Sequence, residues 1–348
     1  MDRRTLLKSL GAIAISTSLP FQLPAKNNKK IIKPGRLQKG DTIGLITPAS
    51  SLFETEQTKI EAKEKMEVLG FKIKFGKNVD KKWGYLAGTD QERINDIHDF
   101  FEDDKVKAIF AIRGGYGSGR LLRHLDYDLI EKNPKILLGY SDITSILIAI
   151  HQMTGLVTFH GPVATSTFTE YTQKYFFKTL TETNPVGEIE DAPYEDNLQQ
   201  SNRVWTVNSG KAKGKLIGGN LTLICMSLGT AYEIETKDKI VFIEEVGEQP
   251  NDLDRMLTQL YNAGKLDVCK GVVFDRMSRV KPADHLPAYS SFLSVEEIIK
   301  DRFKEFKYPV CFGLSLGHIK DKPTLPLGIE AELDADSGRL SLLESAVV

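Results

Sequence analysis

Cysteine is scarce in this 348-residue chain, which contains only Cys225, Cys269 and Cys311. Their number is odd and no two of them form a C-x-x-C motif, so the sequence offers neither a disulfide framework nor a zinc knot. Each lies in an apolar stretch. We therefore expect all three to be buried and to pack as small hydrophobic side chains.

An excess of charge of either sign is also absent. The chain has 46 lysine and arginine residues against 47 aspartate and glutamate residues, a net charge of −1 at pH 7. This balance gives no basic field to attract nucleic acid and no acidic tail. Because a single hydrophobic core rarely extends over a chain of this length, we expect an ordinary globular protein of two domains.

The apolar run near the N-terminus, residues 10–19, is too short to span a membrane. It follows the pair Arg3-Arg4 and precedes Ala25, and this order of charged segment, short apolar segment and small residue indicates an export signal. The arginine pair resembles a twin-arginine signal, whose cargo crosses the membrane folded. We expect residues 1–25 to direct export to the periplasm or cell envelope and 26–38 to form a basic linker; a disordered leader on a cytoplasmic protein is the alternative.

Short apolar runs alternate with helical patterns between residues 39 and 165. Strands are expected at 41–47, 71–75, 108–112, 136–139 and 157–160, and helices at 54–69, 90–101, 120–125 and 140–153. This alternation predicts an α/β fold, with an N-terminal domain built on a doubly wound, mainly parallel sheet. Ligands of such sheets bind at the carboxyl ends of the strands.

The helical and strand patterns fade between residues 166 and 212, which we interpret as a connector. A smaller C-terminal α/β domain is expected over 213–345. Its predicted strands are 239–243, 271–274 and 310–314, its helices 252–263 and 295–303, and its terminal hairpin pairs 329–333 with 340–343.

Four glycines surround Ser118 in the stretch that follows the strand at 108–112. Their spacing fits neither the dinucleotide motif nor the P-loop, and Tyr116 and Arg120 replace the glycines of a hydrolase elbow. A turn between strand and helix exposes the serine Oγ and aims backbone N–H groups at the same point. The turn by itself leaves two interpretations open, a nucleophile and a cradle for phosphate or dinucleotide.

A serine nucleophile needs a base and a group that orients the base. His160 ends a predicted strand and His318 follows another, so either is placed at a carboxyl edge. The remaining histidines lie in predicted helices or in a polar loop, where surface or packing roles are expected: His98, His124, His151 and His285. For the acid, Glu244 and Glu245 end the strand at 239–243, and one of the two faces inward because side chains alternate.

Eight motifs occur in an order that resembles the L,D-carboxypeptidase family, which includes the muramoyltetrapeptide carboxypeptidases and the microcin-resistance peptidases. They are GYLAGTD (84–90), RGGYGSGRLL (113–122), GYSDIT (139–144), HGP (160–162), GGNL (218–221), FIEEVGE (242–248), DRML (254–257) and GH (317–318). The resemblance covers residues 39–333. Residues 281–291 and the segment between the domains match no motif, so substrate selection could differ there.

The resemblance implies a serine peptidase with a Ser-Glu-His triad that acts without a metal ion or an organic cofactor. Matched by motif, Ser118 is the nucleophile, Glu244 the orienting acid and His318 the base, which leaves His160 in the wall of the cleft. The oxyanion hole of the family is formed by backbone amides around the nucleophile, which here implies Gly119 and one of the pair Gly114-Gly115, for which we choose Gly115.

The expected substrate is a peptidoglycan-derived peptide, a murein tetrapeptide that loses its terminal D-alanine, and the expected assembly is a homodimer. Arg113 and Arg120 are candidates to bind the free carboxylate of that peptide, unless they form surface salt bridges. Further candidates for the pocket are Tyr116, Tyr140 and Ser141, with Asp142 beside them, although Ser141 and Asp142 are equally good helix caps. The alternatives are a peptidase of the same class acting on another amide, such as a microcin-like nucleotide peptide amide, and a non-catalytic envelope protein that binds peptide or nucleotide.

Overall fold

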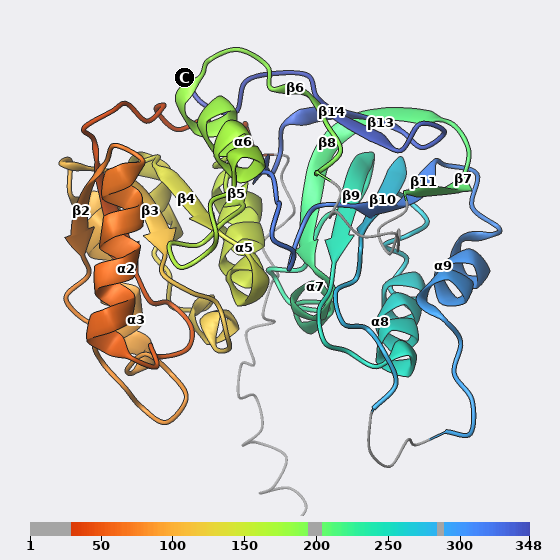
Figure 1. The fold of residues 1–348 in the computed structure, drawn as a ribbon, viewed down its shortest axis with the longest axis horizontal. Helices are drawn as coiled ribbons and strands as arrows, with labels where there is room; N and C mark the ends of the chain where they lie inside the picture. The colour runs from red at the N-terminus through yellow and green to blue at the C-terminus, as the bar shows by residue number, and fades with distance from the viewer. Residues whose placement is uncertain (1–28, 194–203, 284–288) are drawn as a thin grey trace, which may run out of the picture.

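The computed structural model describes residues 29–193, 204–283 and 289–348, and the description below concerns these ranges. They form two α/β lobes that lie side by side (Figure 1). The predicted export signal and His285 fall outside the described residues. The two-unit α/β architecture expected from the sequence is confirmed.

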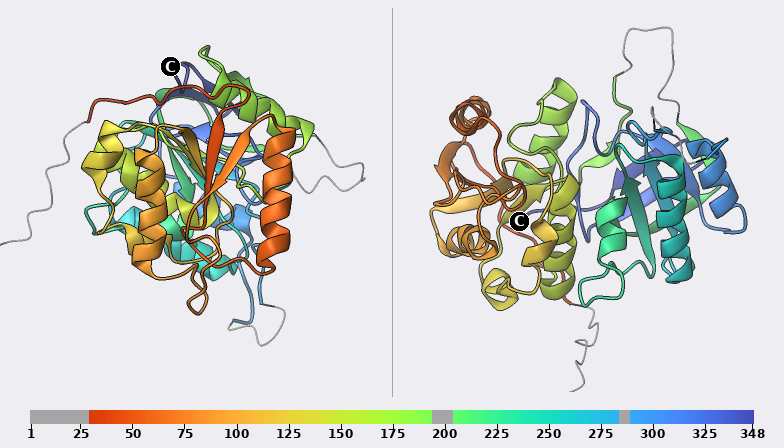
Figure 2. Two further views of the ribbon diagram at one scale, coloured as in Figure 1. Left: turned by 90° about the vertical axis from the view of Figure 1, so that its left-hand side faces the viewer. Right: turned by 90° about the horizontal axis from the view of Figure 1, so that it is seen from below.

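The N-terminal lobe is built on a six-stranded sheet in the order β12-β5-β4-β3-β1-β2. The strands are β1 (Thr42–Ile46), β2 (Lys72–Phe75), β3 (Val106–Ala111), β4 (Ile136–Gly139), β5 (Phe159–His160) and β12 (Leu325–Pro326). All pairs are parallel except β12 with β5. Helices lie on both sides of the sheet (Figure 2), and they are α2 (Thr55–Val68), α3 (Asp90–Glu102), α4 (Tyr127–Lys132), α5 (Thr144–Thr154) and α6 (Glu170–Thr181).

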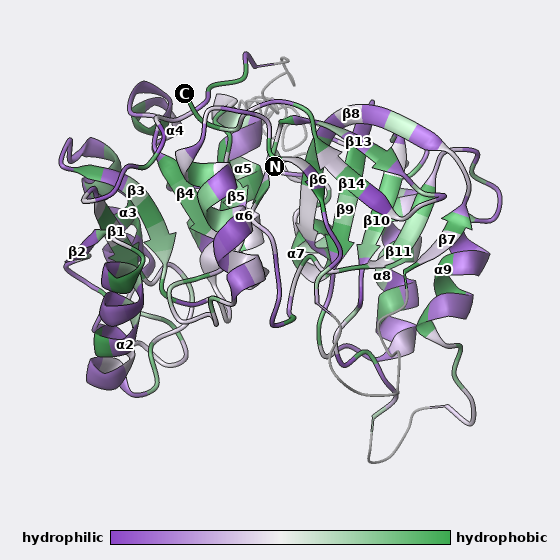
Figure 3. Ribbon diagram, turned by 45° about the horizontal axis from the view of Figure 1, so that its top comes forward, coloured by the Kyte–Doolittle hydropathy of each residue, from purple (hydrophilic) through white to green (hydrophobic). Residues whose placement is uncertain are grey.

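The C-terminal lobe contains an eight-stranded sheet in the order β6-β14-β13-β8-β9-β10-β11-β7. Its strands are β6 (Gly187–Ile189), β7 (Trp205–Asn208), β8 (Lys211–Asn220), β9 (Lys239–Glu244), β10 (Gly271–Asp275), β11 (Val310–Leu314), β13 (Glu330–Asp334) and β14 (Arg339–Leu342). The central strands β8 to β11 are parallel and the flanking ones antiparallel. The helices α7 (Leu221–Met226), α8 (Pro250–Asn262) and α9 (Val295–Phe303) complete the lobe. Apolar strands lie inside and polar helix faces outside (Figure 3).

The predicted connector, residues 166–212, is wrong in part because it contains regular structure. Helix α6 begins after Thr169, whose side chain accepts a hydrogen bond from the backbone N–H of Thr172. One face of this helix is buried, including Tyr171, Tyr175 and Leu180. This spacing was readable as a helix, although threonines and charges between the aromatic residues obscure it. The connector also supplies β6, β7 and the start of β8 to the second sheet.

The helix predicted at 120–125 is also wrong. Ser118 begins a four-residue 3₁₀ helix, η1 (Ser118–Leu121), and α4 starts only after Asp126, whose carboxylate accepts the N–H of Leu129. A 3₁₀ helix this short has a weaker dipole than the full helix expected there. Any positive potential at Ser118 therefore comes from individual N–H groups.

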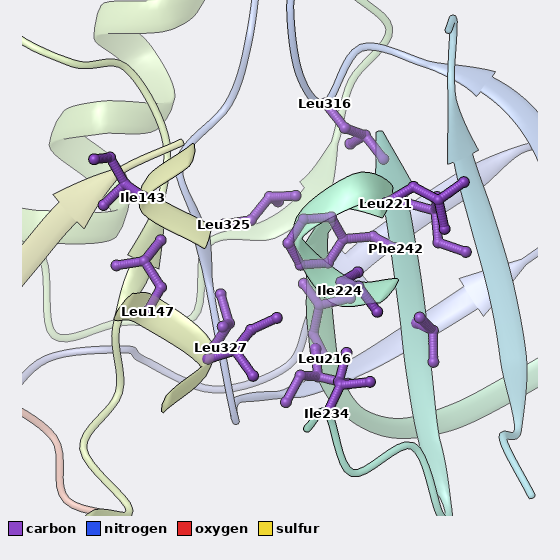
Figure 4. Close-up of a cluster of buried hydrophobic side chains, with 14 of the residues drawn as sticks. Ile143, Leu147, Leu216, Leu221, Ile224, Ile234, Phe242, Leu316, Leu325 and Leu327 are labelled. Carbon is purple, nitrogen blue, oxygen red and sulfur yellow. The ribbon is translucent and has the colours of Figure 1, made fainter. Parts of the chain in front are cut away.

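The two lobes share an apolar interface formed mainly by α5 of the first lobe with β8 and α7 of the second. Figure 4 shows this cluster, with Ile143 and Leu147 from the first lobe and Leu221, Phe242 and Leu316 from the second. Approach is close because two glycines, Gly218 and Gly219, come just before the last residue of β8. A Cβ on Gly219 would lie 2.6 Å from the side chain of Thr144.

The end of the chain returns to the N-terminal lobe. Strand β12 pairs with β5, and Ala346 and Val347 are buried in the core around β1 and β3. The last residue, Val348, exchanges backbone hydrogen bonds of 2.9 and 3.0 Å with Arg36 and Pro34. The first lobe is therefore completed by residues from the far end of the sequence.

The three cysteines are buried and free, as predicted. Burial raises the pKa of the Cys225 and Cys311 thiols to about 12 and that of Cys269 to about 11, so all three stay protonated at neutral pH. Among the helices of the described ranges, none has the length and apolar character needed to cross a membrane.

Candidate active site

The turn around Ser118 (residues 113–119, the serine turn) follows β3 at the carboxyl edge of the N-terminal sheet, as predicted. Gly117 has a φ of +115°, and a Cβ there would lie 2.3 Å from Leu86, so both conformation and space require glycine. Ser118 comes next and is fully buried. The turn fixes the backbone of the serine against the core.

Two buried side chains hold the turn from opposite sides. The carboxylate of Asp142 accepts the backbone N–H of Ser118 at 2.8 Å and that of Gly117 at 3.3 Å. The guanidinium of Arg93, on α3, donates to the carbonyl oxygens of Gly117 at 2.9 Å and Pro48 at 2.8 Å. Burial raises the pKa of Asp142, against the hydrogen bonds from Ser118 that favour its charged form.

The sequence pointed to Asp142 only as a residue near the pocket or a helix cap, and it did not point to Arg93. Asp142 follows β4, the neighbour of β3, so its place at the same edge was readable. Arg93 lies in mid-helix with no local signal, and only the packing of α3 against the turn gives it a role.

An acid and a histidine of the C-terminal lobe contact each other directly. Glu244 is the last residue of β9 and is fully buried, while His318 follows β11 with 18% of its side chain exposed. Nδ1 of His318 lies 2.7 Å from Oε2 of Glu244. A carboxylate accepts and does not donate, so Nδ1 bears the proton and Nε2 is left to act as a base.

The neighbouring Glu245 has a different task. Its carboxylate accepts hydrogen bonds from the side-chain amide of Asn220 at 3.0 Å and from the backbone N–H and hydroxyl of Thr222 at 2.8 Å each. These groups form the start of α7. Of the two acids that the sequence left open, Glu244 is therefore the one beside the histidine, and Glu245 holds the helix.

Gly317 explains how the acid comes so close to the loop of His318. A Cβ at this position would lie 2.5 Å from Oε2 of Glu244 and 2.6 Å from its Cβ. Any larger residue would displace the carboxylate or the histidine. The Gly-His pair noted in the sequence is thus a packing requirement of the Glu244–His318 contact.

The segment Tyr140–Asp142 lies between the serine turn and the histidine. The ring of Tyr140 is 4.9 Å from that of His318, and Asp142 binds the turn. Ser141, between them, has a φ of +63°, a strained value for a residue other than glycine. Tyr140 and Ser141 were both expected near the pocket, and the structure places them between the two lobes' candidate groups.

The hydroxyl of Ser118 is bound to a backbone carbonyl in this structure. Its Oγ donates to the backbone carbonyl of Asp142, and within the described residues it makes no hydrogen bond to His318. Apo geometry of this kind does not exclude catalysis, because such bonds often form only with substrate bound. The hydrogen bond to the Asp142 carbonyl must break before Oγ can donate its proton to Nε2.

His160 requires a correction, since we expected it in the wall of the cleft. Its side chain is fully buried, with the ring packed edge-on against Tyr140 and Phe242. Nε2 donates to the carbonyl of Leu316 at 2.9 Å. His160 therefore lies behind the site and supports the loop that leads to His318, because the aromatic rings in front of it exclude it from the surface.

Two buried histidines predict a loss of stability in acid. Burial lowers the pKa of His151 and His160 to about 4, and each ring bonds a backbone carbonyl. Because both pKa values are depressed from about 6.5, the stability is complete above pH 6.5 and is lost as pH falls toward 4, by up to about 3 kcal/mol for each histidine. Asp275, whose pKa is raised to about 7, opposes this trend.

Denaturant unfolding of the wild type and of His151→Asn at pH 7.5 and pH 5 measures the effect. We expect the wild type to lose about 2 kcal/mol more than the variant between the two pH values. Equal losses in the two proteins would contradict the assignment of His151 as a neutral buried group.

The arginines near the turn differ in their contacts. Arg120 is bound by both oxygens of Asp90, at 2.9 and 3.0 Å, and is thus committed to a salt bridge. Arg113 donates to the carbonyl of Ser51 at 3.0 Å and lies 4.3 Å over the ring of Phe53, with no carboxylate partner in the described part of the chain. Of the two arginines, Arg113 is therefore the one whose guanidinium is available to bind an anion.

Tyr116 and the glycines of the turn lie at its outer side. Tyr116 is 52% exposed and packs edge-on against Tyr85. A Cβ on Gly115 would lie 2.4 Å from Oγ of Ser50, and one on Gly119 would lie 2.4 Å from the methyl group of Met226 in α7. The second lobe therefore lies directly against the serine turn at Gly119. Neither glycine position has room for a side chain.

Metal ligation has no candidate among residues 29–193, 204–283 and 289–348. No group of three or more His, Cys, Asp or Glu side chains there is arranged to hold an ion.

The chain is similar to known proteins over most of its length. A family model described as the LD-carboxypeptidase N-terminal domain matches residues 43–161, and one described as the LD-carboxypeptidase C-terminal domain matches residues 213–333. A probable murein peptide carboxypeptidase of Bacillus subtilis (strain 168) is 37% identical over 324 residues, which cover 90% of this chain and 95% of the relative. The microcin C7 self-immunity protein MccF of Escherichia coli is 30% identical over 334 residues, covering 88% and 94%.

Solved structures show the same likeness. A muramoyltetrapeptide carboxypeptidase from Oxalobacter formigenes superposes with a TM-score of 0.74 at 28% identity, over 87% of this chain and 99% of the other. The wild-type apo form of MccF superposes with a TM-score of 0.81 at 26% identity, over 91% and 100%.

Proposed function

The chain belongs to the LD-carboxypeptidase family and is a serine-type carboxypeptidase, and on this premise we propose that it removes the terminal D-alanine from murein tetrapeptides. Ser118, Glu244 and His318 are the proposed catalytic residues. The observation that supports this most is the 2.7 Å contact between Glu244 and His318, next to Tyr140 and the segment that binds the serine turn.

In the proposed mechanism Ser118 first rotates away from the Asp142 carbonyl. Nε2 of His318 then takes the hydroxyl proton while Oγ attacks the carbonyl carbon of the diamino acid. The C–N bond breaks, His318 passes the proton to the amine, and D-alanine leaves. Water, deprotonated by His318, hydrolyses the acyl-enzyme and releases the tripeptide. The negative charge of Glu244 stabilises the imidazolium in each step.

The tetrahedral intermediate needs donors for its oxyanion. The N–H groups of Gly119 and Gly115 are our candidates, because the N–H of Ser118 is occupied by Asp142. One such donor typically lowers the barrier by about 3 kcal/mol.

The terminal carboxylate of the peptide needs a cation, since a carboxypeptidase must recognise a free chain end. We assign this role to Arg113, because Arg120 is already paired. The side chains of Tyr116, Tyr140 and Ser141 complete the proposed pocket.

A second substrate class is supported by the relatives. MccF, 30% identical to this chain, has been solved with aspartyl sulfamoyl adenosine, so a microcin-like nucleotide peptide amide is the alternative substrate. A non-catalytic binding protein is set aside, because the family assignment makes the chain a peptidase.

The two substrate classes are separated by direct comparison. Purified protein is incubated with a murein tetrapeptide and, separately, with an aminoacyl sulfamoyl adenosine, and release of the free amino acid is followed by mass spectrometry. We expect kcat/KM for the tetrapeptide to be at least tenfold higher, because 37% identity joins the chain to a murein peptide relative. A preference for the nucleotide amide would reverse the assignment.

We further propose that residues 1–25 direct export to the cell envelope and that the enzyme acts as a homodimer. Both follow from the sequence and its family resemblance. Mass spectrometry of the protein recovered from the envelope fraction tests the proposed export. The elution volume of the purified protein in size-exclusion chromatography tests the homodimer.

A further inference from the structure

Leu316 is the anchor of the loop that carries the proposed base. It lies two residues before His318, and its side chain is fully buried in the apolar cluster between the lobes, close to Leu221 and Phe242 (Figure 4). The loop itself has no regular structure between β11 and β12. The contacts that hold Leu316 in place therefore also determine where His318 lies relative to Glu244 and the serine turn.

Both backbone polar groups of Leu316 are held by buried side chains. Its N–H donates to Oδ1 of Asp275 at 2.9 Å, and its carbonyl accepts from Nε2 of His160 at 2.9 Å. Asp275 and His160 are each 0% exposed. A hydrogen bond made in such surroundings is costly to lose, because the group left behind cannot turn to water.

The two side chains come from different lobes. Asp275 ends β10, the neighbour of the strand that bears Glu244. His160 ends β5 in the N-terminal sheet, beside β4, whose end continues into the segment that binds the serine turn. The carbonyl of Leu316 is thus tied to the lobe of the nucleophile and its N–H to the lobe of the acid.

We propose that His160 and Asp275 form a clamp on Leu316 that sets the position of His318 relative to Ser118 across the lobe interface. They are positioning residues, and the proposal rests on the proposed function in that Ser118 and His318 react with each other. Misplacement of a base by about 1 Å can cost about a hundredfold in rate, so a clamp on the loop affects turnover without contacting substrate.

The ring of His160 is suited to this role. A carbonyl accepts and does not donate, so Nε2 must bear the proton. Nδ1 has no hydrogen-bond partner among the described residues, and burial lowers the pKa of the ring to about 4, so the histidine stays neutral and keeps one tautomer near pH 7. Phenylalanine would keep the shape and lose the donor, whereas glutamine can place an amide N–H near the position of Nε2.

The test measures activation of the serine separately from substrate recognition. A fluorophosphonate probe reacts with a serine activated by its histidine, so its labelling rate reports the Ser118–His318 geometry. We expect His160→Phe to label about 30-fold to 100-fold more slowly than the wild type. His160→Gln should stay within about fivefold, and in turnover the Phe variant should lose kcat with little change in KM.

A matched control is available in the same lobe. His151 is likewise buried and bonds a backbone carbonyl, that of Leu156 at 3.0 Å, but this carbonyl does not lead to the site. His151→Phe should lower the melting temperature as His160→Phe does and leave labelling within about threefold. Equal slowing by the two, or normal labelling of His160→Phe, would overturn the clamp.

Variants of Asp275 test the other side of the clamp, the bond to the N–H of Leu316. They do so even if His160→Phe fails to fold. Asp275→Asn and Asp275→Ala both remove the charge near Glu244, but only asparagine keeps an acceptor for the N–H of Leu316. We expect the alanine variant to label at least tenfold more slowly than the asparagine variant; equal rates would sink the proposal. If the wild type labels but releases no D-alanine, the substrate assignment fails while these comparisons still test the clamp.

Discussion

Ser118→Ala should reduce D-alanine release from a murein tetrapeptide by at least about 10⁴-fold, because no other group can form the acyl-enzyme. The variant should fold, since the backbone N–H of residue 118 still donates to Asp142 and Arg93 still holds Gly117. Binding and the oxyanion donors account for what activity remains. Turnover of purified variant and wild type, with trapping of the acyl adduct by mass spectrometry, measures the effect.

Ser145 provides the control for this substitution. It is a buried serine on α5 whose Oγ makes no hydrogen bond within the described part of the chain and lies 3.6 Å from where a Cβ on Gly119 would be. Ser145→Ala removes a hydroxyl close to the same turn and should stay within about threefold of wild-type turnover. A Ser118→Ala enzyme with a tenth or more of the wild-type rate would refute the nucleophile.

Glu244→Gln should lower kcat by about 10³-fold to 10⁴-fold while leaving the fold intact. The amide group of glutamine can face Nδ1 of His318 as a donor, which forces the proton onto Nε2 and leaves the ring in the tautomer that cannot accept from Ser118. The imidazolium would also lose its buried counter-charge. Steady-state kinetics with the tetrapeptide measures the loss, which should fall on kcat more than on KM.

Glu245→Gln is the matched variant, because it is the next residue, has the same side chain and is equally buried. The substitution replaces one accepting oxygen by an NH₂ donor that faces the donors of Asn220 or Thr222, so we expect a loss of about 1–2 kcal/mol in unfolding free energy. Its kcat should remain within about tenfold of wild type. A kcat loss in Glu245→Gln as large as that in Glu244→Gln would contradict the assignment of Glu244 as the acid that orients His318.

The sequence predicted the candidate site to the extent that strand ends determine it. Ser118 and Glu244 follow apolar runs, and the carboxyl ends of parallel strands meet at one edge, so their place was readable. The choice of His318 over His160 came from the family resemblance. The contact of His318 with Glu244 depends on Gly317, whose missing side chain gives the room.

What escaped prediction depends on neighbours distant in the chain. Arg93 and Asp275 act through backbone groups of other segments, Gly117 and Leu316, and no local pattern announces such a pairing. His160 was misjudged for the same reason, because its burial is due to Tyr140 and Phe242. Helix α6 was missed because its apolar stripe is interrupted by polar residues that pack inside, such as Thr172 and Thr179.

The return of the chain end to the first lobe has a consequence for biosynthesis. Strand β12 and the buried pair Ala346 and Val347 are synthesised long after β1, β3 and β5, although they pair with β5 or fill the core around β1 and β3. The nascent protein cannot complete its first lobe until this distant segment has been synthesised. Removal of Ala346 and Val347 would therefore disturb the half of the molecule that is synthesised first.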